Sequence, residues 1–304
     1  MVLLPKNIAL APMAVFLKPS VAETLIRIFS DVHYGDRSSR VRSLSQLLPL
    51  TEGVGRVVLN GDMLDTREGP NPAHTEACRA DVRSFIARAG LPITFLTGNH
   101  DPDFSDLHTL EFGGDQVFVI HGDILFDSIT PWGHDAEPIR RKVHAALAAL
   151  PPGTERVLEE RIRVFRRVAA SIRQRHQAER HPLKYVYRFV TDTIWPLHSA
   201  LSMLRAWRDM PALASALTRQ HRPRARFAVL GHTHRPGIWP SANGVTVINT
   251  GSFSLPFGGQ VVDLTEGRLT VRRIEMRRGD FHAGRVVAEF ALAEAEAIPH
   301  QGKG

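Results

Sequence analysis

Short apolar runs alternate with segments of helical periodicity between residues 24 and 120. An apolar run of about four to eight residues between turn residues is typical of a buried strand, whereas apolar positions three and four residues apart indicate an amphipathic helix. These patterns predict strands over residues 24–30, 56–59, 93–97 and 116–120, and helices over residues 41–50 and 72–89. Strands that alternate with helices indicate an α/β fold, in which sites form beyond the carboxyl ends of the strands.

Helical periodicity then continues without a strand between residues 137 and 226. It predicts helices over residues 137–150, 155–179 and 183–207, the last kinked or interrupted at Pro196. Strands resume over residues 227–230, 244–249, 260–264 and 268–274. We therefore divide the chain into an N-terminal arm (1–23), a core (24–136 and 227–287), a helical cap inserted into that core (137–226) and a frayed tail (288–304).

Positive charge is concentrated in this helical insertion. Residues 137–226 contain 19 Lys and Arg against 7 Asp and Glu, whereas the rest of the chain contains 19 against 24. One region is therefore strongly basic and the other mildly acidic, which indicates that the two have different roles.

The composition is that of a folded protein of one large domain or two small ones, with 304 residues, 43% of them hydrophobic and 23% charged. Cys78 is the single cysteine, which excludes an intramolecular disulfide and a cysteine-based zinc cluster. No run approaches the roughly 18 apolar residues of a membrane-spanning helix. Residues 1–21 are apolar but broken by prolines and lysines, which favours a surface arm over a degenerate export signal. We expect a cytoplasmic protein.

Polar side chains follow five of the predicted strands directly. They are Asp31 and His33, Asp62 and Asp65, Asn99 and His100, His121, and His232 and His234. If the strands share a sheet system, these side chains converge on one edge. Oxygen and imidazole ligands without thiolates suit divalent manganese, iron or zinc.

The spacing within these segments fits such a cluster. Asp31 and His33 are separated by one residue, as are His232 and His234, so each pair can point to the same side of an extended chain. A carboxylate such as that of Asp62 can bridge two metals about 3.5–4 Å apart. Any one of these segments alone is typical of an ordinary turn, but five in order, each after a strand, are not explained by coincidence.

Read together, the segments DVH (31–33), GDMLD (61–65), GNHD (98–101), HGD (121–123) and GHTH (231–234) resemble the motif set of the calcineurin-like metallophosphoesterases. Asn249-Thr250-Gly251-Ser252 resembles the segment that follows the last histidines in that family. The resemblance implies a four-layer α/β/β/α sandwich with two divalent metals at the sheet edge.

It also implies which residues hold each metal. The first metal would be bound by Asp31, His33, Asp62 and His234, and the second by Asp62, Asn99, His121 and His232. Manganese is the first expectation for both, with iron and zinc as alternatives.

The reaction that the resemblance implies is hydrolysis of a phosphoester or pyrophosphate bond by a hydroxide that bridges the two metals. His100 would lie outside the metal ligands, near the leaving-group oxygen, where it could donate a proton. Asp65 would orient a ligand histidine or His100, and Asp101 is a second candidate for orienting His100.

The layout resembles most closely the UDP-2,3-diacylglucosamine hydrolases, which also place a helical cap between the HGD and GHTH motifs. A basic, amphipathic cap suits a substrate with both phosphates and acyl chains, here a lipid-linked nucleotide. The chain departs from that group at His100, where the resemblance leads us to expect arginine.

Other interpretations of the basic helices remain open. They could form a solvated face, a nucleic-acid clamp for a nuclease or general phosphodiesterase, or a peripheral contact with the inner membrane. A metal-free scaffold that binds through these helices is the non-enzyme alternative. The oligomeric state stays open.

Two further residues are candidates for substrate binding. Arg235 follows the last histidine and could reach a substrate phosphate, and His134 lies on a loop after the fourth motif. Cys78 lies in a predicted helix, and we interpret it as a packing residue, because the expected chemistry needs no thiolate.

Overall fold

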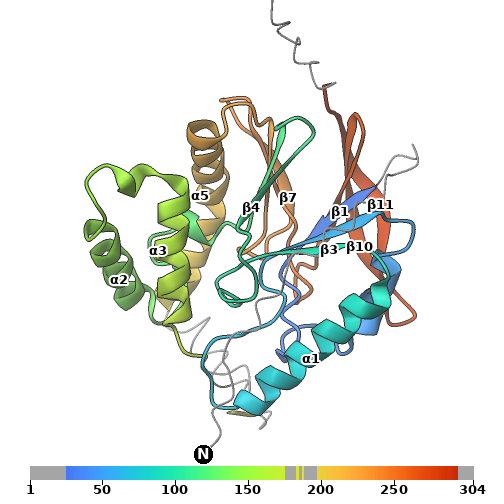
Figure 1. Cartoon of the computed structure of the whole chain (residues 1–304), viewed down its shortest axis with the longest axis horizontal. Coiled ribbons are helices and arrows are strands. Elements are labelled where there is room, and N and C mark those ends of the chain that lie inside the picture. Colours follow the sequence, from blue (N-terminus) through green and yellow to red (C-terminus); the bar gives the residue numbers. More distant parts are fainter. Residues whose placement is uncertain (1–24, 175–182, 185–186, 188–196, 294–304) are drawn as a thin grey trace, which may run out of the picture.

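The computed structural model contains two β-sheets packed face to face, with helices on both outer sides (Figure 1). It describes residues 25–174, 183–184, 187 and 197–293. The first sheet has the order β11-β10-β9-β1-β2-β3, and the second β4-β5-β6-β8-β7. This is the four-layer α/β arrangement that the motifs predict.

The element bounds are as follows. The strands are β1 (Ile26–Phe29), β2 (Arg56–Asn60), β3 (Ile93–Leu96), β4 (Thr109–Phe112), β5 (Val117–Ile120), β6 (Phe227–Leu230), β7 (Gly237–Pro240), β8 (Thr246–Asn249), β9 (Gln260–Thr265), β10 (Arg268–Arg277) and β11 (Asp280–Ala291). The helices are α1 (Pro72–Ala89), α2 (Ala136–Ala148), α3 (Leu158–Ala170) and α5 (Leu197–His221), with short 3₁₀ turns η1 (Leu44–Leu50), η2 (Asp123–Leu125) and η3 (Thr154–Arg156).

Alternation along the central strands separates three hydrophobic layers. In β1, Ile28 faces the second sheet, whereas Phe29 faces α1 and η1. In β5, Val119 faces the first sheet and Phe118 faces α2, α3 and α5. Because successive strand side chains point to opposite faces, one strand serves two layers, and the sandwich needs a helical cover on each outside.

The parallel pairs fix where a site can form. β1, β2 and β3 run parallel, and so do β5, β6 and β8. Their carboxyl ends therefore bring the loops that follow them to common edges of the sheets.

Helix α1 matches its predicted range because its end signals are strong. The Asn71 side chain accepts a hydrogen bond from the backbone N–H of His74, and Pro72 occupies the first turn. Gly90 ends the helix in the left-handed conformation.

The insertion differs from the predicted cap. In its described part, α2, α3 and α5 pack directly on the second sheet and form the outer layer of the sandwich (Figure 1). Val143, Phe165 and Met210, one from each helix, are fully buried in the same core as Phe118. The apolar stripe of each helix, read as a cap surface, is thus core.

Several predicted boundaries also shift. Helix α3 ends at Ala170 rather than at residue 179, and α5 continues past residue 207 to His221. The predicted kink at Pro196, the arm (1–23) and the tail from residue 294 onward lie outside the described residues. Residues 288–291 belong to β11 rather than to the tail, because β11 pairs with β10 up to Ala291.

Strands β4, β7 and β11 were not predicted. Each lies at or next to the edge of a sheet, where half of the backbone pairing and much of the burial that marks a central strand are missing. Among the described residues, no helix combines the length and apolarity that crossing a membrane requires.

Candidate metal centre

The loops after β1, β2, β3, β5 and β6 meet at one edge, and their Asp and His side chains form three groups. Within each group the candidate ligand atoms lie within 4.8 Å of one another. The groups are Asp31, His33 and His234; His33, Asp62 and His100; and Asp62, His121 and His232. Residues from opposite ends of the chain are thus brought together.

Tight backbone turns aim these side chains. Asp31, His33, Asp62, His232 and His234 all have positive φ, between 47° and 66°. Non-glycine residues rarely adopt this left-handed conformation, although Asp and His tolerate it better than most. The turns are held by backbone hydrogen bonds, such as that from the Asp31 N–H to the Gly61 carbonyl (3.1 Å).

In the first group, His234 Nε2 lies 3.2 Å from Asp31 Oδ1 and 3.0 Å from His33 Nε2. The Asp31 carboxylate also accepts hydrogen bonds from the backbone N–H of His232 (3.0 Å) and from the Ser30 hydroxyl. These contacts fix the carboxylate while directing two imidazoles toward it. Burial raises the pKa of Asp31, but its histidine partners outweigh this and hold the pKa well below the ordinary value.

In the group of Asp62, His121 and His232, the orientation of both rings is set by backbone carbonyls. His121 Nδ1 lies 2.8 Å from the Asn60 carbonyl and donates to it, so Nε2 faces Asp62 Oδ2 at 3.3 Å. His232 Nε2 donates to the Ile129 carbonyl (2.8 Å), which leaves Nδ1 as the ring atom able to bind a metal.

Two buried atoms of this group test whether a cation fits. Within the part of the chain that the structure describes, His121 Nε2 and Asn99 Oδ1 have no hydrogen-bond partner, which is rare for buried polar atoms. Burial lowers the pKa of His121, yet the Asp62 carboxylate outweighs it and raises the pKa well above its ordinary value. Positive charge is therefore strongly favoured between these side chains, and the donor set of carboxylates, amide and imidazoles fits divalent cations.

Sequence reasoning missed the loop that supports His232. Ile129 has a φ of 61°, which is unusual for a β-branched residue, and it presents the carbonyl that orients His232. The Trp132 ring packs on His232, with 5.4 Å between the centroids. The Trp132-Gly133-His134 segment could have indicated this loop from the sequence. Its tryptophan packs on the candidate ligand His232, whereas its histidine is the residue predicted to bind substrate.

His100 lies beside the metal groups and is held by two charged residues. Its Nδ1 lies 2.9 Å from Asp65 Oδ2 and 2.9 Å from Arg67 NH2, and Arg67 also forms a bidentate ion pair with Asp65. Burial and the Arg67 guanidinium lower the pKa of His100, although Asp62 and Asp65 act in the opposite direction. Arg67 was not predicted, because nothing in its local sequence distinguishes it from a surface arginine.

Asp101 has a different task from Asp65. Its carboxylate accepts hydrogen bonds from the backbone N–H groups of Gly98 (2.7 Å), Asp62 (3.1 Å) and Met63 (2.7 Å). Asp101 thus ties the loop after β3 to the loop after β2, whereas Asp65 contacts the His100 ring.

The two candidate substrate-binding residues differ in their surroundings. The Arg235 guanidinium stacks on Trp207 and Trp239, at 5.9 Å and 5.6 Å from the ring centroids, and donates to the Trp207 carbonyl. The side chain of His134 is 59% exposed and lies 3.8 Å from Asp135. Substrate contact remains a prediction for both.

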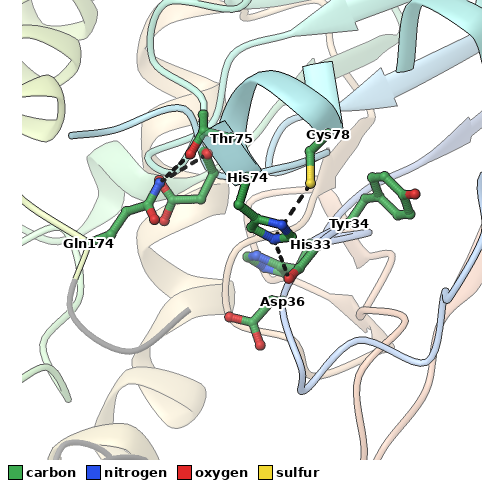
Figure 2. Close-up of a pocket in the computed structure, with 9 residues that line it drawn as sticks. His33, Tyr34, Asp36, His74, Thr75, Cys78 and Gln174 are labelled. Carbon is green, nitrogen blue, oxygen red and sulfur yellow. Dashed lines mark hydrogen bonds between the residues drawn. The ribbon is translucent and has the colours of Figure 1, made fainter. Parts of the chain in front are cut away.

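A small pocket that is open to solvent adjoins the site between α1 and the loop after β1. Figure 2 shows His33, Tyr34, His74 and Cys78 on one side of it and Gln174 on the other. Burial raises the pKa of the Cys78 thiol to about 11, so this cysteine stays protonated at neutral pH. The interpretation of Cys78 as a packing residue agrees with that environment.

A Gly98→Ala substitution is expected to reduce hydrolysis by about 100-fold, the cost of a displacement of about 1 Å in a catalytic site. A Cβ at Gly98 would lie 2.6 Å from the Asp62 backbone nitrogen and would also meet the Asp62 carboxylate. Gly53→Ala is the control, since Gly53 has open space and a φ of 66°. The control should cost about 1 kcal/mol of stability in a denaturant titration and leave turnover unchanged. Equal turnover in both variants would contradict the prediction.

Two sheets whose strand ends gather carboxylates, an amide and imidazoles define a metal-dependent phosphoester hydrolase. The chain belongs to the calcineurin-like phosphoesterase family, whose model matches residues 24–236. No curated protein matches the chain.

Solved structures of low sequence identity align over most of the chain. A dimetal phosphatase from Danio rerio is 14% identical with a TM-score of 0.46, over 89% of this chain and 99% of that one. A predicted phosphoesterase from Streptococcus pneumoniae is 16% identical with a TM-score of 0.35, over 90% and 99%. Vps29 from Chaetomium thermophilum is 10% identical with a TM-score of 0.41, over 89% and 100%. The family assignment rests on the family model.

Proposed function

We propose that this protein hydrolyses a phosphoester or pyrophosphate bond with two divalent cations, manganese before iron or zinc. The observation that carries the proposal is a pair of buried atoms in the cluster around Asp62, His121 Nε2 and Asn99 Oδ1, for which the described residues offer no hydrogen-bond partner. Asp31, His33, Asp62 and His234 would hold one cation, and Asp62, Asn99, His121 and His232 the other. When bound, such cations supply Lewis acidity and activate the attacking water.

The residues around the metals would handle the leaving group. His100 donates a proton to the departing oxygen, and Asp65 and Arg67, each 2.9 Å from its Nδ1, keep the ring in place. Arg67 also brings a buried positive charge next to His100, the position at which the resemblance leads us to expect arginine.

For the substrate we propose a lipid-linked pyrophosphate such as an acylated UDP-sugar. Apolar side chains are exposed after β8 and on α5: Leu255 (71%) and Phe257 (47%) after β8, and Leu204 (55%) on α5. Phe257 packs on Trp207, whose Nε1 donates to the Thr233 carbonyl between the two histidines (2.9 Å). This apolar surface supports the proposal that acyl chains bind next to the metal centre. It also supports a peripheral contact with the cytoplasmic face of a membrane.

The basic charge of the insertion gives less support to a nucleic-acid clamp. Arg140 and Arg141 pair with Glu137, and Arg222 pairs with both Glu111 and Glu159. Charges that are already paired within the protein attract phosphates less strongly.

The test compares hydrolysis of an acylated UDP-sugar, the same UDP-sugar without acyl chains, and single-stranded DNA. We expect activity to disappear after chelation, to return with Mn²⁺, and to favour the acylated compound. Equal rates on both UDP-sugars would remove the support for a lipid substrate, and cleavage of DNA alone would establish the nuclease alternative. A folded protein with neither stoichiometric metal nor hydrolysis would establish the scaffold alternative.

A further inference from the structure

Gln174, four residues after α3, is a buried polar residue that belongs to neither set of candidate metal ligands. Its side-chain Nε2 donates to the backbone carbonyls of Asp65 (3.1 Å) and Arg67 (2.8 Å). Its backbone N–H donates to the Glu68 carbonyl (2.8 Å). The residue is only 8% exposed, so these three bonds are shielded from water.

The loop that receives Gln174 is shaped to accept it. A Cβ at Gly69 would lie 2.7 Å from the Gln174 Cδ, so a side chain at this position would displace the Gln174 amide. Figure 2 shows Gln174 reaching toward Thr75 at the start of α1, across the pocket from His33 and Tyr34. Asp65 and Arg67 on this loop are the two residues that hold the His100 ring.

A second contact joins α3 to the loop that follows His100. Arg166 NH2 donates to the Ser105 carbonyl (2.5 Å), Nε donates to the Pro102 carbonyl, and NH1 lies 3.1 Å from His108 Nε2. Helix α3 itself is fixed by Ile162 and Phe165 in the core against the second sheet.

We infer that Arg166 and Gln174, which we call the α3 latch, are positioning residues for the Asp65–His100 pair. Each contacts one of the two loops that carry the pair: Arg166 lies on α3 and contacts the loop after His100, and Gln174 follows α3 and contacts the loop of Asp65 and Arg67. The inference rests on the proposed proton donation by His100. In this interpretation the insertion contributes to the reaction by positioning His100, without contacting the substrate.

The test uses two phosphodiesters that differ only in the leaving group, 4-nitrophenolate and an alkoxide. An alkoxide needs a proton to depart, whereas 4-nitrophenolate does not. Gln174→Ala should lower kcat about 10-fold on the alkyl ester, part of the roughly 10²–10⁴-fold that proton transfer contributes. On the 4-nitrophenyl ester kcat should change less than about twofold, with KM unchanged on both.

The variants are chosen to separate positioning from folding. Gln174→Glu keeps the shape but cannot donate to the two carbonyls, and should behave like Gln174→Ala. Arg173→Ala, which removes an ion pair to Glu68 between side chains 76% and 70% exposed, is the matched control and should leave both rates unchanged. In a His100→Asn background, Gln174→Ala should cause no further loss, because the two changes remove the same step.

A uniform loss of kcat on both esters, or additive losses in the double variant, would overturn the inference. Hydrogen exchange of the metal-free chain gives a readout without activity: exchange at residues 65–68 should accelerate in Gln174→Ala, and unchanged exchange would also overturn the inference. If the unaltered protein hydrolyses neither ester with metal, the proposed function fails while the exchange result still decides whether the latch holds the loop.

Discussion

An Asp62→Asn variant will lose both bound metal and hydrolysis. Asp62 is 1% exposed and lies between the two sets of candidate metal ligands. Its Oδ2 lies 3.7 Å from His33 Nε2 in one set and 3.3 Å from His121 Nε2 in the other. Losing an outer partner of a metal ligand already costs about 10–100-fold in affinity, so losing a shared ligand should cost more than about 100-fold. Metal content after dialysis and hydrolysis with added Mn²⁺ measure the two effects.

The Asp62→Asn variant should keep the fold of the unaltered protein, because the amide can make the same backbone hydrogen bond. Asp62 Oδ1 accepts a hydrogen bond from the His100 backbone N–H (2.9 Å), and an amide oxygen can accept the same bond. Asp115→Asn, on a partly exposed carboxylate that pairs with Arg224, should change neither quantity. Full metal content in Asp62→Asn would show that Asp62 is not the shared ligand.

A His100→Asn variant will lose turnover while it retains metal. Proton transfer to a leaving group contributes about 10²–10⁴-fold, and kcat should fall by that amount. Metal should remain because Arg67, at 2.9 Å from Nδ1, already places a positive charge against the ring, which disfavours a cation there. Steady-state kinetics on an ester with a poor leaving group and metal analysis of the same preparation provide the measurement.

The group of His33, Asp62 and His100 defines the result that would contradict this prediction. His100 lies within reach of His33 and Asp62, so a loss of metal in this variant would make it a ligand. His144→Asn, on the exposed face of α2 where it contacts Asp127, is the control and should leave kcat and metal content unchanged.

The position of the site could be predicted because it depends on strand direction. Parallel strands place the residues that follow them at a common edge, so Asp31, Asp62 and His232 converge although they lie far apart in sequence. The sandwich could be predicted for the same reason, since the apolar runs of its central strands are short, continuous and buried on both faces.

The supporting residues could not be predicted, because they act through the backbone or through distant contacts. Ile129 contributes a carbonyl, Arg67 depends on the proximity of His100, and Gln174 depends on where α3 ends. The sequence predicts a cap for the insertion because an apolar helical stripe does not say what it packs against. The described helices α2, α3 and α5 pack on the second sheet.

The left-handed backbone at Asp31, Asp62 and His232 has a consequence for engineering. Conformations of this kind disfavour folding by roughly 1 kcal/mol or more for a residue with a side chain, and glycine would relieve them. Screening variants for heat resistance alone would thus tend to select glycine at these positions. The selected proteins would be more thermostable but would lack the candidate metal ligands. Thermostabilised forms should be sought with these turns held unaltered.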